Sequence, residues 1–268
     1  MAEENSNNPQ PQQRVISLQN ISQEFLGALQ RNYDMLAFNL AATQNVTAEQ
    51  YEQFSAMTHA MPVHQIHAPF DGVKNFAHGL ILRQTLNDAL SIAAACMDQC
   101  HLLCSLIKNK PNAEKDPQAT HQAIGKEQEA FARSPLSEKF EILEKNYNIT
   151  NSLEDAVVSF GIGFGELLRN NGVVSADAAD ENGELVFEFK TVQVVAPLKE
   201  GDKPEVRLID TRRAFKVGDQ IDLSNSELLS VYVTLTDFFH KLFKAIDGYG
   251  VKMIEAQKNN DKPSPSDQ

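Results

Sequence analysis

The longest apolar pattern in the chain extends from about residue 71 to residue 108 and repeats with helical spacing. Steps of four and three alternate along one stripe, which is formed by Gly79, Leu82, Leu86, Ala89, Ala93, Cys96, Cys100, Leu103 and Ile107. In its middle part only Arg83, Asp88 and Asp98 are charged. A helix with so few charges around it has to be covered by several neighbours, so the pattern predicts a central helix. Pro111 is expected to end it.

Six other segments carry apolar stripes of helical period. We expect these helices at about residues 18–44, 47–57, 117–132, 135–146, 152–171 and 225–256. Their starts are marked by Thr47 with Gln50, by Asp116 and Ser134 before prolines, by Ser152 with Asp155, and by Ser224 with Glu227. A strand is the rival interpretation at Val231 to Thr236, because several residues there are β-branched.

The period changes from 3.6 to 2 after residue 184. Leu185, Phe187 and Phe189 alternate with polar or outward positions, and a second β-rich segment covers 206–217. The sequence therefore predicts a mainly α fold: a helical bundle around one long central helix, with a small antiparallel β-hairpin at about 184–217 before the C-terminal helix. One helical domain at 14–257 is expected, with disordered tails at 1–13 and 258–268 that are rich in polar residues and proline.

Composition narrows the class of protein. The chain has 268 residues, of which 42% are apolar, enough for a core. Its net charge of −12 argues against nucleic acid as the main ligand, since that ligand needs a concentrated positive surface. The first thirteen residues lack the apolar core of a signal peptide, and the apolar helices carry polar interruptions. We therefore expect a soluble cytoplasmic protein with no membrane contact.

Three cysteines lie within nine residues of the central helix, which indicates reduced thiols. Cys96, Cys100 and Cys104 follow one another at steps of four, with His101 beside them. Thiolates on adjacent turns suit a soft metal such as Cu(I) or Zn²⁺, so these four residues are the candidate metal ligands. The alternative is that Cys96 and Cys100 fill the apolar stripe as small hydrophobic residues. No other cofactor is expected.

A second cluster holds four of the seven histidines within twenty residues: His59, His64, His67 and His78. It suggests either a metal or pH-sensitive patch, alone or together with the cysteines, or a solvated group of histidines on a proline-bounded connection. Gly161, Gly163 and Gly165 fall inside a predicted helix, which favours close helix packing over a phosphate loop.

Two further patterns involve arginine residues. Helical ribonucleases of the HEPN class use an Arg-polar-x4-His motif; Arg31-Asn32 and Arg169-Asn170 supply its first half, but neither has the histidine. Basic residues also gather on the second predicted strand, at Arg207, Arg212, Arg213 and Lys216. They suggest either an anion-binding edge or a solvated face that keeps an edge strand from aggregating.

No catalytic signature accompanies the apolar helices, so we expect a non-enzymatic cytosolic interaction or regulatory protein. It would act by binding another protein or a second copy of itself. The first alternative is a soft-metal-binding bundle that uses the cysteine helix. The second is a divergent helical nuclease in which Arg31, Arg169 or His78 converge in one cleft.

Overall fold

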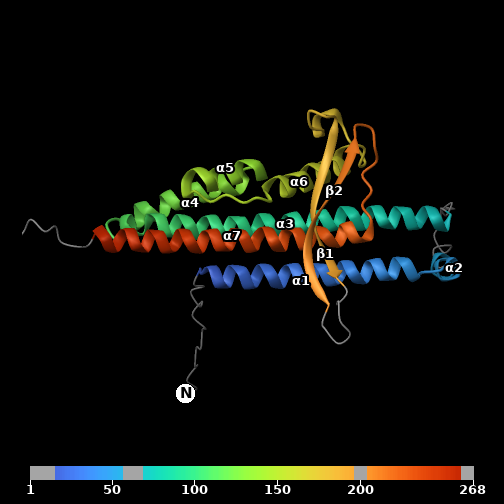
Figure 1. The fold of residues 1–268 in the computed structure, drawn as a ribbon, viewed down its shortest axis with the longest axis horizontal. Helices are drawn as coiled ribbons and strands as arrows, with labels where there is room; N and C mark the ends of the chain where they lie inside the picture. The colour runs from blue at the N-terminus through green and yellow to red at the C-terminus, as the bar shows by residue number, and fades with distance from the viewer. Residues whose placement is uncertain (1–15, 57–68, 196–203, 261–268) are drawn as a thin grey trace, which may run out of the picture.

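The computed structural model describes residues 16–56, 69–195 and 204–260, and it confirms the mainly α fold (Figure 1). The helices are α1 Leu18–Asn45, α2 Ala48–Ala56, α3 Phe70–Ala113, α4 Pro117–Arg133, α5 Leu136–Tyr147, α6 Glu154–Arg169 and α7 Asn225–Asn260. The strands β1 Glu184–Val195 and β2 Glu205–Lys216 form the hairpin between α6 and α7. Residues 258–260 of the expected C-terminal tail belong to α7. The rest of the expected tails, the loop before residue 204 and three clustered histidines, His59, His64 and His67, lie outside the described residues.

The core is built where α1, α3 and α7 run side by side, with α1 antiparallel to the other two (Figure 1). The stripe predicted for α1 is buried, and its Phe25 ring meets Phe239 and Phe243 of α7. Helices α4 to α6 cover the opposite side of α3. Asn225, the first residue of α7, lies in one groove with Leu40 and His78. The last part of α1 and the first part of α3 therefore extend beyond the start of α7.

Helix α3 has 44 residues and is the one described helix long and apolar enough to cross a membrane by length and composition. Of its most apolar window, 44% is buried inside the protein, and the core helix of a soluble protein meets the same two criteria. The predicted end of this helix was wrong by a few residues, because α3 continues through Pro111 to Ala113. Pro111 cannot donate to the Ile107 carbonyl four residues before it, and α3 continues for two residues beyond the proline.

Several predicted helix starts are confirmed. Thr47 and Gln50 exchange hydrogen bonds of 3.0 and 3.2 Å, and Ser224 and Glu227 exchange bonds of 2.7 and 3.3 Å. Asp116 accepts a hydrogen bond from the Ala119 N–H at 3.0 Å. The stretch from Val231 to Thr236, for which a strand was the rival interpretation, is part of α7.

Two predicted helix starts were placed on the wrong residues. Ser152 and Asp155 do not cap α6; instead Glu154 Oε1 accepts from the Asn151 N–H at 2.6 Å, and Asn151 Oδ1 accepts from the Leu153 N–H at 3.1 Å. Ser134 does not cap α5, because its hydroxyl donates back to the Ala130 carbonyl. Both helices nevertheless begin within two residues of the expected positions.

The hairpin lies across α6 and α7. Its strands are antiparallel and pair from Glu184 opposite Lys216 to Val195 opposite Glu205. Phe187 and Phe189 are buried against the Phe160 ring of α6. The Phe187 ring lies so close to Gly163 that a Cβ there would sit 2.3 Å from its Cζ. Gly163 thus permits close packing, as the sequence suggested, but the element packed against it is the hairpin and not another helix.

Candidate interaction surfaces

The predicted metal ligands all lie on α3 and are buried. Cys96, Cys100 and Cys104 are free thiols in the hydrophobic core. Burial raises the pKa of the Cys96 thiol, which also hydrogen-bonds to Cys100, and it raises the pKa of Cys104 to about 12. Thiols with raised pKa values stay protonated at neutral pH, whereas a metal ligand has to be deprotonated.

His101 faces α4. Its Nδ1 lies 2.7 Å from Gln128 Oε1, and its ring stacks on Phe131 with the centroids 4.0 Å apart. Gln128 in turn donates to the Asp98 carbonyl at 2.9 Å. Burial lowers the pKa of His101, more than the hydrogen bond to Gln128 raises it, so the imidazole is neutral. These contacts give His101 a packing role between α3 and α4.

Within residues 16–56, 69–195 and 204–260, no group of three or more histidine, cysteine or acidic side chains is placed to hold a metal ion. The metal site remains a prediction from sequence. Of the histidine cluster, His78 is described, and its Nε2 lies 3.9 Å from Asp222 Oδ1. For the nuclease alternative, Arg31 and His78 line different grooves, and Arg169 pairs with Glu166 on α6.

An uncharged surface at one end of the molecule was not singled out by the sequence analysis. None of residues 35–48 and none of residues 75–82 is Asp, Glu, Lys or Arg, although 22% of the whole chain is charged. The two segments belong mainly to α1 and α3 and lie around the start of α7, because Leu40 and His78 share a groove with Asn225. Four large apolar side chains are exposed on them, and we call this set the uncharged face: Met35, Phe38, Phe76 and Leu80.

A groove of about 520 Å³ lies between α1 and α3 beside the uncharged face, and Met35 and Leu80 belong to both. Its apolar lining includes Met35, Leu36, Leu80 and Ile81, and Tyr232 of α7 also contributes. Most of the polar lining is amide and hydroxyl groups, from Asn32, Asn39, Thr43, Gln84 and Thr85, and one carboxylate, Asp88, lies at the groove and accepts from Gln84 at 2.7 Å. The groove therefore offers apolar contact with mostly neutral hydrogen-bonding groups and one acidic group beside it.

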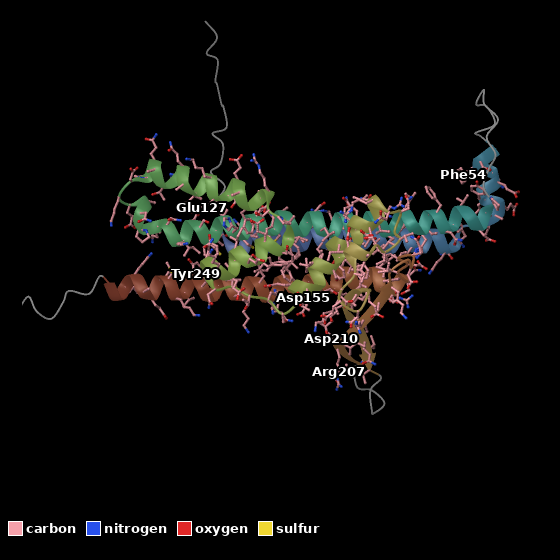
Figure 2. All side chains as sticks on the ribbon, turned by 90° about the horizontal axis from the view of Figure 1, so that it is seen from above. Phe54, Glu127, Asp155, Arg207, Asp210 and Tyr249 are labelled. Carbon is pink, nitrogen blue, oxygen red and sulfur yellow. The ribbon has the colours of Figure 1, made fainter. Side chains whose placement is uncertain are left out.

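Two of the basic residues of β2, Arg207 and Arg212, have acidic partners, whereas Arg213 lies over the Phe215 ring. Arg207 pairs with Glu205 at 2.7 Å, Arg212 lies 3.6 Å from Glu184, and Asp210 pairs with Lys190 of β1 at 2.5 Å. Figure 2 shows Arg207 and Asp210 near the end of the hairpin that projects from the helices. The strand is therefore a surface of alternating charge.

No protein-family model matches this chain, and no curated protein and no solved structure is significantly similar to it. Its function has to be inferred from its own surfaces. Of those described above, the uncharged face departs furthest from the surface of an ordinary soluble domain, where roughly a quarter to a third of residues are charged.

Proposed function

We propose that this chain is a non-enzymatic interaction protein and that an apolar helix of a partner protein binds along the uncharged face. The observation that carries the proposal is the coincidence of exposed aromatic side chains with an absence of charge. Phe38 is 67% exposed and Phe76 is 65% exposed. Large exposed apolar surfaces on soluble proteins mark interaction sites.

The free energy available from such a contact is substantial. A phenylalanine buries about 150–250 Å² when it is fully covered, and apolar burial contributes about 25 cal/mol per Å². Covering the exposed two-thirds of Phe38 and of Phe76 therefore contributes on the order of 5 kcal/mol before the entropy of association is subtracted. Large aromatic side chains of this kind are the usual anchors of protein interfaces.

A helix fits the groove better than an extended segment does. The groove runs between two helices and is also lined by Tyr232 of α7, so an amphipathic helix laid along it would pack on α1 and α3 beside the start of α7. Helix-in-groove recognition relies on apolar residues at helical spacing and needs no exposed backbone groups on the receptor. Because the chain carries a net charge of −12, a neutral surface also avoids repelling an acidic partner.

A photo-cross-linking residue placed at position 38 tests the proposal in cells that produce the full chain. The expected product joins position 38 to an apolar helical segment of another protein, and Phe76→Glu should reduce its yield about tenfold. The matched control places the cross-linker at Ile254, which is also exposed but lies on α7. Equal products from positions 38 and 254, or no effect of Phe76→Glu, would contradict the proposal. If the cross-linked products contain only two copies of this chain, the uncharged face binds a second copy and not a different protein.

A further inference from the structure

In the part of the chain that the structure describes, no strand lies beside the outer edge of β2, and at its last residue Lys216 exchanges hydrogen bonds of 2.8 and 2.9 Å with Asp219. The sheet has two strands, and the helices that contact it, α6 and α7, contact β1. β2 has twelve residues, most of them exposed. Proteins usually cover, shorten or twist away an edge of this length, because its unpaired N–H and C=O groups recruit another strand.

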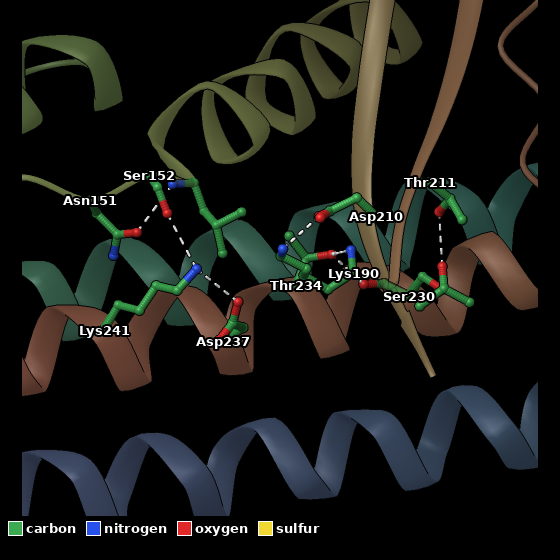
Figure 3. Close-up of polar contacts among 11 residues, drawn as sticks. Asn151, Ser152, Lys190, Asp210, Thr211, Ser230, Thr234, Asp237 and Lys241 are labelled. Carbon is green, nitrogen blue, oxygen red and sulfur yellow. Dashed lines mark hydrogen bonds and ion pairs between the residues drawn. The ribbon is translucent and has the colours of Figure 1, made fainter. Parts of the chain in front are cut away.

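The pairing shows which groups of β2 point outward. Lys190 lies opposite Asp210, and the Lys190 N–H points away from β2, donating to Thr234 Oγ1 of α7 at 2.8 Å (Figure 3). In an antiparallel ladder, pairs that exchange hydrogen bonds alternate with pairs whose groups point outward. Asp210 therefore belongs to the outward set, which consists of Val206, Leu208, Asp210, Arg212, Ala214 and Lys216.

We propose that β2 pairs antiparallel with β2 of a second copy, with Thr211 opposite Thr211, so that two hairpins form one four-stranded sheet. In this register every outward residue meets an outward residue. Across the sheet, Lys190 and Asp210 are followed by Arg212 and Glu188 of the second copy. The charges in this row alternate from positive to negative across the four strands. The two-fold axis of the dimer generates a second, identical row.

The next row on the same face is apolar throughout. It consists of Val192 and Leu208 followed by Ala214 and Val186 of the second copy. Val192 and Leu208 are both about half exposed in one chain, at 47% and 51%. Cross-strand pairs of β-branched, apolar and opposite-charge residues each contribute roughly 0.2–1 kcal/mol, so both rows favour the same register.

The neighbouring registers are unfavourable. A shift of two residues in one direction places Asp210 opposite Asp210 and Arg207 opposite Arg213. A shift of two residues in the other direction places Arg212 opposite Arg212. Like charges directly opposite one another destabilise a sheet. The charges that protect β2 from indiscriminate pairing thus also select one register for self-pairing.

Sedimentation of the full chain tests the assembly directly. The expected mass is twice the 29.8 kDa of one chain. Asp210→Arg and Arg212→Glu each place two like-charge pairs across the two-fold axis and should weaken the dimer about tenfold or more. Arg213→Glu makes the same charge change on the same strand but lies opposite Ile209, so it should leave the dimer intact.

Mixing Asp210→Arg with Arg212→Glu shows whether each substitution weakens the dimer through charge repulsion between strands or by damaging the hairpin of its own chain. In the mixed dimer, the arginine introduced at position 210 of one chain faces the glutamate introduced at position 212 of the other. The unchanged Arg212 of the first chain faces the unchanged Asp210 of the second, so both pairs across the axis are attractive. The equimolar mixture should therefore form a heterodimer although neither variant forms a homodimer. A mixture that stays monomeric would overturn the proposal, as would a wild-type dimer that neither variant weakens.

Amide exchange supplies a readout that does not depend on substitution. In a single chain the outward amides of Leu208, Asp210 and Arg212 exchange quickly, while those of Ile209 and Thr211 are protected by β1. Dimerisation should protect both sets, and dilution should release the outward set alone. A monomeric mass with unprotected outward amides at high protein concentration would also overturn the proposal. None of these variants changes a residue of the uncharged face. The dimerisation test can therefore fail while the cross-linking test of the proposed function succeeds, and the reverse.

Discussion

Gly163 is the residue at which α6 and the hairpin come closest. A Cβ at this position would meet the Phe187 ring at 2.3 Å, and that ring is fully buried, with little room to move. Gly163→Ala should therefore lower the free energy of unfolding by about 1–3 kcal/mol, although alanine is the better helix former. Chemical denaturation measures the change. Gly125→Ala in α4, where nothing lies within 4 Å, should instead raise stability by about 0.5–1 kcal/mol. Similar losses at both positions would contradict the close packing.

Glu166 is a buried carboxylate that joins the end of α6 to the following turn. Burial opposes its ionisation, but hydrogen bonds from Asn170 Nδ2 and the Ser175 N–H, both 2.8 Å, outweigh burial and lower its pKa. Its stabilising contribution is complete above the carboxyl's unfolded pKa of about 4.3 and is lost as pH falls through the lower folded value.

Glu166→Gln should accordingly cost about 1–3 kcal/mol at pH 7, because an amide cannot accept from the same donors without placing its NH₂ beside one of them. The difference from the wild-type protein should shrink as the solution is acidified below the folded pKa. Urea denaturation at a series of pH values measures it, with Glu141→Gln at an exposed position of α5 as the control. A constant difference at all pH values would mean that the carboxylate charge is unimportant.

At the scale of elements, the hairpin is joined to α7 by a hydrogen bond from the backbone of β1 to a side chain of α7. Thr234 Oγ1 accepts from the Lys190 N–H and donates to the Ser230 carbonyl at 2.7 Å, and Ser230 lies beside Thr191 (Figure 3). Thr234→Val keeps the volume but leaves the Lys190 N–H without an acceptor, which should cost about 1–3 kcal/mol. Exchange of the Lys190 amide should accelerate more than that of core amides in α3. Thr236→Val removes only a bond to the preceding turn of its own helix and should change little.

The elements themselves were largely predictable, because helical period, strand period and capping boxes are local properties of the chain. The errors fall where local signals compete. The stretch from Thr150 to Asp155 offers several capping side chains in a row, and only the folded geometry selects Asn151 and Glu154. Pro111 removes one hydrogen bond to the preceding turn, and this loss does not prevent α3 from continuing to Ala113.

The candidate site was less predictable than the fold. The burial of Cys96 and Cys100 followed from the spacing of the stripe, but Cys104 is buried although the stripe continued through Leu103, and the exposure of Phe38 and Phe76 depends on which faces of α1 and α3 the other helices leave uncovered. That is a tertiary fact, and no local pattern contains it. The signal that was available is the absence of charge over residues 35–48, since the solvent face of an amphipathic helix normally carries charge. A search for uncharged helix faces, as well as for apolar stripes, would have found this surface.

At the scale of the whole molecule, one hydrophobic cluster links α1, α3, α6, the hairpin and α7. Elements that share one core unfold together, so we expect a single cooperative transition in which helix content and the packing of aromatic rings are lost at the same denaturant concentration. Phe239 is a sensitive probe, because its buried ring lies 4.1 Å from that of Phe25 and 4.9 Å from that of Phe238.

Phe239→Ala should lower the free energy of unfolding by about 3–5 kcal/mol and move both signals together, with the denaturant dependence unchanged. Far-ultraviolet circular dichroism and one-dimensional NMR of the aromatic region provide the two signals. Phe54→Ala on α2, an exposed ring outside the core, should leave the transition in place. If Phe239→Ala shifted only the aromatic signal, or if the wild-type protein unfolded in two steps, the helices and the hairpin would not share one cooperative core.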